Sequence, residues 1–65
     1  MPYDSISSLP LPVREHLPKH AQEIWMDVFN SADRDYGEES RAARAAWAAV
    51  KRDYHKTPRG QWVKV

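Results

Sequence analysis

The chain has 65 residues, no cysteine and a formal net charge of +1. Disulfide bonds and thiolate-based zinc sites are therefore excluded, and a chain this short must gain its stability from one shared apolar core. It contains no run of about 18 apolar residues to span a membrane, and its N-terminal segment lacks the basic start and apolar centre of a signal peptide. We therefore expect a single-domain, soluble and cytoplasmic protein.

Charge is divided unevenly along the chain. Residues 1–40 contain three Lys or Arg and eight Asp or Glu, a balance of −5, whereas residues 41–65 contain seven basic residues and one acidic residue, a balance of +6. Two explanations are open. Either the two halves attract each other within the fold, or the basic half presents a face to an acidic partner.

Prolines divide the first part of the chain. Residues 1–11 have no usable periodicity and are expected to form an extended lead-in. Pro12 suits the first turn of a helix, where its missing N–H is harmless, so a short helix is predicted over about 12–16. Pro18 disfavours helix at the residue before it and starts a longer helix over about 18–36.

The longer helix carries the apolar stripe around which the rest of the chain is organised. Its apolar residues recur at steps of three and four, which is the spacing of one face of an α-helix. Gly37 follows as the residue able to adopt the left-handed conformation at the helix end. We expect the aromatic side chains to form core rather than a ligand pocket. The stripe consists of Ala21, Ile24, Trp25, Val28, Phe29, Ala32 and Tyr36.

A second long helix is predicted over about 39–56, after a short connection that favours an antiparallel helix pair. Residues 57–65 are expected to form a turn and a tail. The tail either pairs as an extended segment with the lead-in, with Trp62 closing the core, or is frayed. The fold class predicted is mainly all-α, a small compact domain with one short helix and a hairpin of two longer ones. The alanine-rich second long helix has the predicted apolar face Ala43, Trp47, Val50 and Tyr54, with Ala46 alongside.

Two Leu-Pro steps and several short runs form a recognisable pattern over most of the chain. The residues that carry it are Leu17, Pro18, His20, Ala21, Gln22, Ile24, Phe29, Asn30, Trp47, Val50, Tyr54 and Trp62. This pattern resembles the ChaB family, small proteins named for a bacterial cation transport regulator. The resemblance implies a compact helical domain that regulates a cation/proton antiporter, with the connection after Tyr36 shorter than in the enteric members.

No residue constellation predicts a reaction, a metal site or a cofactor site. His16 and His20 are four residues apart, but a proline between them separates the two helices and removes the geometry of a metal pair. His20 and Glu23 lack a third ligand. No serine lies in a recognisable nucleophile motif, and Gly37 and Gly60 are too few for a phosphate-binding loop. We therefore predict no enzyme activity, no metal and no cofactor.

The basic half supplies the residues predicted to contact a partner, an acidic surface of another protein such as an antiporter at its cytoplasmic face. We expect the basic residues of the second long helix to be spread around it rather than aligned, which argues against nucleic-acid binding. Two alternatives remain: a nucleic-acid-associated accessory protein of phage origin that uses the same basic half, and a homo-oligomer that exchanges its tail. The predicted partner-binding residues are Arg44, Lys51, Arg52 and Lys56.

Three polar residues lie on or beside the apolar stripe of the longer helix. They are His20, Gln22 and Asn30. Polar groups at the edge of a core are normally hydrogen-bonded, so we expect these side chains to bond the loops that enter the core.

Overall fold

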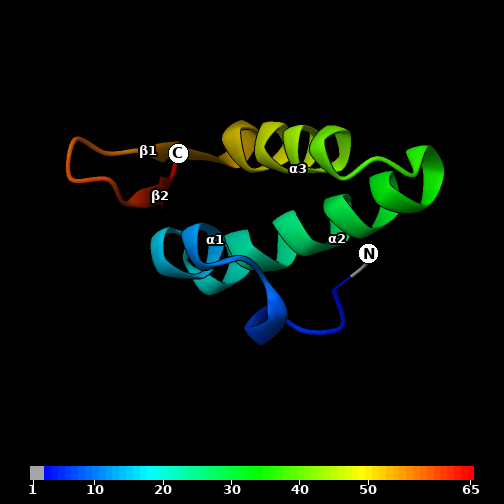
Figure 1. Ribbon diagram of the computed structural model, residues 1–65. Helices are drawn as coiled ribbons and strands as arrows, with labels where there is room; N and C mark the ends of the chain where they lie inside the picture. The colour runs from blue at the N-terminus through cyan, green and yellow to red at the C-terminus, as the bar shows by residue number, and fades with distance from the viewer. Residues whose placement is uncertain (1–2) are drawn as a thin grey trace.

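The computed structural model describes residues 3–65, and the first two residues of the predicted lead-in lie outside the described range. Two long helices pack against each other, and a short helix and a small hairpin complete the fold, so the mainly helical fold class is confirmed (Figure 1). In chain order the elements are a 3₁₀ turn η1 (Ile6–Ser8), the helices α1 (Leu11–His16), α2 (Lys19–Tyr36) and α3 (Glu39–Asp53), and the strands β1 (Tyr54–Lys56) and β2 (Trp62–Lys64).

The corner between α2 and α3 is made by Gly37, as the sequence predicts. This glycine adopts the left-handed conformation with φ 67°, and its N–H donates a 2.7 Å hydrogen bond to the carbonyl of Asp33. The conformation is costly for residues with a Cβ and open to glycine. Because α3 begins at Glu39, the two helices run antiparallel and lie side by side (Figure 1).

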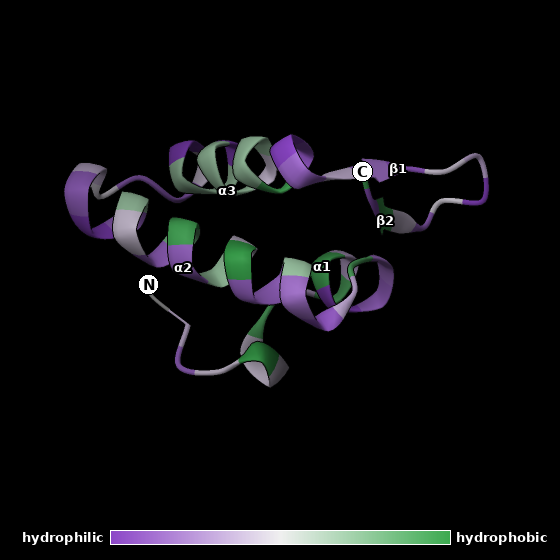
Figure 2. Ribbon diagram, turned by 180° about the vertical axis from the view of Figure 1, so that it is seen from behind, coloured by the Kyte–Doolittle hydropathy of each residue, from purple (hydrophilic) through white to green (hydrophobic). Residues whose placement is uncertain are grey.

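The core lies between α2 and α3 and is closed by the segment before α2. Figure 2 shows hydrophobic bands at intervals along α2, separated by hydrophilic ones, as the periodicity requires. Trp25 and Phe29 are each 2 % exposed, and their rings stack with centroids 5.0 Å apart. The buried residues are Leu9, Val13, Leu17, Ala21, Trp25, Phe29, Ala32, Ala42, Ala46, Val50 and Tyr54.

Two parts of the predicted apolar faces are placed differently by the structure. Tyr36 is 55 % exposed at the end of α2, where the guanidinium of Arg41 lies 4.0 Å from the centre of its ring. On α3 the predicted Ala46 and Val50 are buried, but the row continues through Ala42 rather than Ala43. The small alanine side chains let the two helix backbones approach closely. Trp47 is consequently half-buried on the flank of the helix.

Side-chain hydrogen bonds fasten the N-terminal segment to α2. The Asn30 side chain accepts a 2.8 Å bond from the N–H of Tyr3 and donates a 3.0 Å bond to the Tyr3 carbonyl. Gln22 donates 2.8 Å to the carbonyl of Leu17, at the end of α1. Within the predicted extended lead-in, residues 6–8 form the turn η1, and α1 begins at Leu11 with Pro12 in its first turn.

The C-terminal hairpin corrects two expectations. α3 ends at Asp53 rather than at residue 56, and the next three residues form β1. β2 pairs antiparallel with β1, Lys56 opposite Trp62, and not with the described part of the lead-in, residues 3–11. The turn between the strands explains this choice, since Gly60 has φ 86° and Thr57 N–H donates 2.7 Å to the Gln61 carbonyl. A short loop closes at far lower entropic cost than pairing with the opposite end of the chain.

Candidate partner-binding site

The outward face of α3 carries a row of basic residues that we call the basic ridge, namely Arg41, Arg44, Lys51 and Arg52, all of them exposed. Successive residues of an α-helix are rotated by about 100°, so these four positions fall within an arc of about 100°, opposite the buried Ala46. The expectation that they are spread around the helix is therefore wrong. At about 1.5 Å per residue the ridge is roughly 17 Å long.

Beside the ridge lies a hollow of about 310 Å³ that we call the basic-aromatic cleft. Three elements that are distant in the sequence supply its walls. The residues that line it are Pro12 and His16 of α1, Trp47 and Lys51 of α3, and Lys56 and Trp62 of the hairpin. Two of these six side chains, Lys51 and Lys56, carry a positive charge and none is acidic, so the cleft favours a negatively charged group.

The aromatic wall of the cleft is anchored to the core. The rings of Trp47 and Trp62 lie with centroids 5.6 Å apart at an angle of 36°. Trp47 in turn packs edge-on against the buried Trp25, with centroids 6.1 Å apart and an angle of 75°. The side of the cleft formed by α1 is fixed as well, because Arg14 Nε donates 2.9 Å to the Leu9 carbonyl and Gln22 holds the end of α1.

The structure divides the predicted partner-binding residues between these two surfaces. Lys51 belongs to both the ridge and the cleft, Lys56 lines the cleft, and Arg44 and Arg52 lie on the ridge outside the cleft lining. Sequence reasoning missed the cleft itself. The sequence left Trp62 either closing the core or in a frayed tail, and the structure packs it partly buried against the core while it also lines the cleft. His16 was considered only as a metal ligand and rejected. The spacing of Trp47 and Lys51 was an available signal, because it places both on one face of a helix.

Apart from Trp47 and Trp62, which line the cleft, the residues that carry the family pattern lie in several different environments. Gln22 and Asn30 make the expected hydrogen bonds to entering backbone segments. Ile24 is half-buried against the core, and Pro18 precedes the first turn of α2. His20 is exposed and lies beside Glu23, with Nδ1 3.6 Å from Oε1, rather than against a loop. The group buried in the core comprises Leu17, Ala21, Phe29, Val50 and Tyr54.

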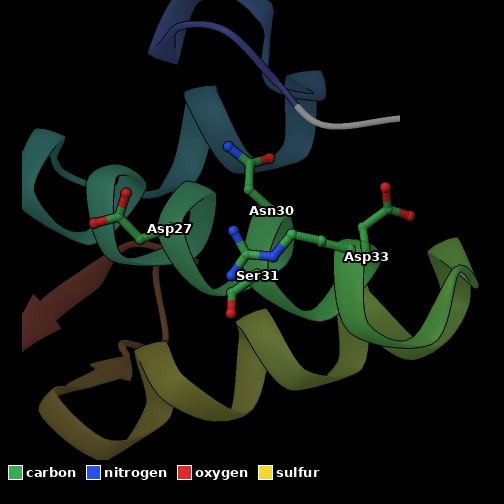
Figure 3. Close-up of a pocket in the computed structure, with 5 residues that line it drawn as sticks. Asp27, Asn30, Ser31 and Asp33 are labelled. Atoms are coloured by element: carbon green, nitrogen blue, oxygen red, sulfur yellow. The ribbon is translucent and has the colours of Figure 1, made fainter.

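A larger hollow of about 530 Å³ lies along α2, but its lining side chains do not converge on a common point. All of its lining residues come from this one helix, and Figure 3 shows the carboxylates of Asp27 and Asp33 pointing in different directions. Asn30, also in its lining, is engaged by Tyr3. Across residues 3–65 no group of three or more His, Cys, Asp or Glu side chains is arranged to hold a metal ion. This hollow therefore brings no reactive groups together.

Fold and surface together define a small helical domain with a basic and aromatic face. The family model for ChaB matches residues 9–65. Proteins named "Putative cation transport regulator ChaB" from Escherichia coli K12 and from Shigella flexneri are 43 % identical over 74 residues, covering 98 % of this chain and 97 % of theirs. This chain belongs to the ChaB family.

A solved structure is also similar to this chain. Described as "NMR solution structure of the putative cation transport regulator ChaB", it matches with a TM-score of 0.90 and 39 % identity, over 98 % of this chain and 99 % of that one. The alignment with the curated relatives spans 74 positions against 65 residues here, so at least nine positions have no counterpart in this chain. Within residues 3–65, none of the helices has the length and apolar character needed to cross a bilayer.

Proposed function

We propose that this protein is a single-domain, non-enzymatic regulator that works by binding an acidic surface of a partner protein. The alignment of Arg44, Lys51 and Arg52 on one exposed face of α3 carries the proposal. A row of like charges on a rigid helix attracts an acidic surface from a distance and orients it on contact. Because these side chains point away from the core, partners can bind them without any rearrangement of the fold.

The relatives' printed name supports a cation transporter as the partner. We therefore propose that this chain acts in the cytoplasm and docks on an acidic segment at the cytoplasmic face of a cation antiporter. A binding role requires neither a cofactor nor a catalytic group, and it uses the exposed face of α3 that carries Arg44, Lys51 and Arg52.

A capture experiment tests this proposal. Tagged protein is incubated with nuclease-treated lysate and solubilised membranes of its source cell, and bound proteins are identified by mass spectrometry. We expect one specific partner, lost from the variant Arg44→Glu, Lys51→Glu, Arg52→Glu.

The matched control carries Lys19→Glu, Arg34→Glu and Arg59→Glu, which makes the same change in net charge at exposed positions away from the ridge. This control should retain the partner, and circular dichroism should show both variants folded. Equal capture by the ridge variant and the wild-type chain would contradict the proposal.

A nucleic-acid-associated role is the second candidate, and the alignment of the ridge favours it more than the sequence analysis allowed. Anisotropy of labelled single-stranded and duplex DNA, measured over a series of salt concentrations, separates the two roles. Phosphate binding by the ridge predicts affinity that falls steeply with salt and is lost in the ridge variant. If no binding of DNA is detected at moderate salt, the nucleic-acid-associated role is ruled out.

A further inference from the structure

We infer that the basic-aromatic cleft binds a short, extended, acidic peptide segment that carries a bulky apolar side chain. In this arrangement Lys51 and Lys56 pair with carboxylates of the segment, and the apolar side chain packs against Trp47 and Trp62. The inference rests on the proposed function, since the segment belongs to the acidic partner, and it adds the site and the chemistry by which that partner is recognised.

The charge of the cleft selects an anion. Its two ammonium groups come from different elements, Lys51 from α3 and Lys56 from β1, and His16 of α1 completes the basic side of the lining. No carboxylate is among the lining residues to neutralise them. A carboxylate that enters the cleft therefore meets the positive charge of two lysines from two different elements, without displacing an existing ion pair of the lining.

The apolar wall of the cleft selects a bulky side chain beside the carboxylates. Trp47 and Trp62 are each half-buried, so part of each indole is covered by the protein and part is available to a ligand. Their mutual contact and the contact of Trp47 with Trp25 hold the two rings in place before binding. A prepared aromatic surface of this kind loses little conformational entropy on binding, and tryptophans are frequent anchors of protein interfaces.

A neighbouring groove makes the binding surface elongated. This second hollow, of about 440 Å³, shares Pro12 and Trp47 with the cleft and extends over Tyr3 and Phe29 to Glu39. The two hollows therefore adjoin between α1 and α3. An extended peptide fits such a track, with its acidic part in the cleft and its apolar part in the groove.

The same groove argues against nucleic acid as the ligand. A polynucleotide carries a phosphate at every residue and needs cations along its whole path. Beyond Lys51 and Lys56, the track becomes apolar, and a carboxylate, Glu39, lies in its lining. A second phosphate would meet this environment, whereas the apolar side chain of a peptide is accommodated by it.

Titration of the full chain with a defined probe tests the inference. The probe is the acetylated peptide Glu-Asp-Leu-Phe-Glu-Asp, and binding is followed by tryptophan fluorescence at low salt. Two control peptides replace either the acidic residues by glutamine and asparagine or the leucine and phenylalanine by alanine. We expect saturable binding of the probe and a loss of about tenfold or more in affinity for each control peptide, as for loss of an anchor residue.

Matched variants locate the site. Lys51→Gln with Lys56→Gln, and separately Trp62→Ala, should each weaken probe binding by about tenfold or more. Arg59→Gln and Val63→Ala change exposed residues of the same hairpin that do not line the cleft, and they should bind the probe as the wild-type chain does. The lysine variant keeps the inference testable if Trp62→Ala disturbs the hairpin, and circular dichroism checks the fold of both.

Three outcomes would overturn the inference: no saturable binding of the probe, equal binding by the cleft variants, or binding of a short single-stranded DNA in the cleft in place of the peptide. The capture experiment distinguishes this failure from failure of the proposed function. If the cleft variant Lys56→Gln, Trp62→Ala captures the partner as well as the wild-type chain while the ridge variant does not, the cleft assignment falls and the regulator proposal stands.

Discussion

The two long helices are both amphipathic, but they use their large side chains differently. α2 buries Trp25 and Phe29 between the elements of the fold. α3 buries alanines at the same interface, Ala42 and Ala46, and keeps Trp47 on its flank, where it forms a wall of the cleft. The difference indicates that α2 supplies the large side chains of the core, whereas α3 supplies the surface that we propose as the partner-binding site. Because alanines fill the contact between α2 and α3, Trp47 is not needed there and remains available to line the cleft.

The largest effect is expected from truncating the central aromatic side chain of α2. Replacing a buried tryptophan by alanine costs about 3–5 kcal/mol, which equals the whole stability of many domains of this size. Trp25→Ala should therefore be unfolded at room temperature, as judged by circular dichroism and the dispersion of its amide NMR signals. Trp47→Ala, on the flank of α3, should remain folded and lose affinity for the acidic probe. If both substitutions unfold the protein, the proposed difference between a core tryptophan in α2 and a surface tryptophan in α3 is wrong.

A smaller effect is expected from enlarging a side chain at the interface between the helices. Ala46 is fully buried against α2, so Ala46→Leu overpacks this contact and should cost about 1–3 kcal/mol in the free energy of unfolding. Ala48→Leu adds the same atoms at an exposed position of the same helix and should change stability by less than about 0.5 kcal/mol. Urea unfolding of the two variants measures the difference, and similar values would mean that the contact is not close-packed.

The smallest of these effects concerns the polar attachment of the N-terminal segment to α2. Asn30→Ala removes two hydrogen bonds to the backbone of Tyr3, whose ring covers Phe29 at a centroid distance of 5.0 Å. The expected cost is about 1–2 kcal/mol, with faster hydrogen exchange at the Tyr3 amide. Ser31→Ala, at the neighbouring exposed position, is the control and should leave both quantities unchanged. Unaltered stability of Asn30→Ala would refute the structural role and point to a partner-facing one.

Local chemistry made much of α2 predictable. The signals that define this helix are all local in the sequence. They are Pro18 before its first turn, the steps of three and four between its apolar residues, and Gly37 at its end. The alignment of the basic ridge on one face of α3 could also have been predicted from the sequence. Positions 44 and 51 are two helical turns apart, and position 52 is adjacent to 51. The prediction that the basic residues are spread around the helix was wrong because their angular positions around the helix axis were not calculated.

The C-terminal half depended on contacts that sequence patterns do not reveal. Residues 54–56 continue the apolar and basic pattern of α3, and only pairing with β2 across the turn removes them from the helix. The cleft depends on such contacts even more, since Pro12 and Trp62 both line it although they are 50 residues apart in the sequence. No periodicity relates these positions, so the cleft appears only when α1, α3 and the hairpin are placed together.

The indole N–H signals of the three tryptophans offer the most direct test of the division between core and surface. In a ¹H–¹⁵N correlation spectrum recorded during titration with the acidic probe peptide, each tryptophan reports its own surroundings. We expect large, saturable shifts of the Trp47 and Trp62 signals and a much smaller change of the Trp25 signal. A shift of Trp25 as large as the other two, or no saturable shift of any of them, would contradict the claim that α3 and the hairpin form the binding surface.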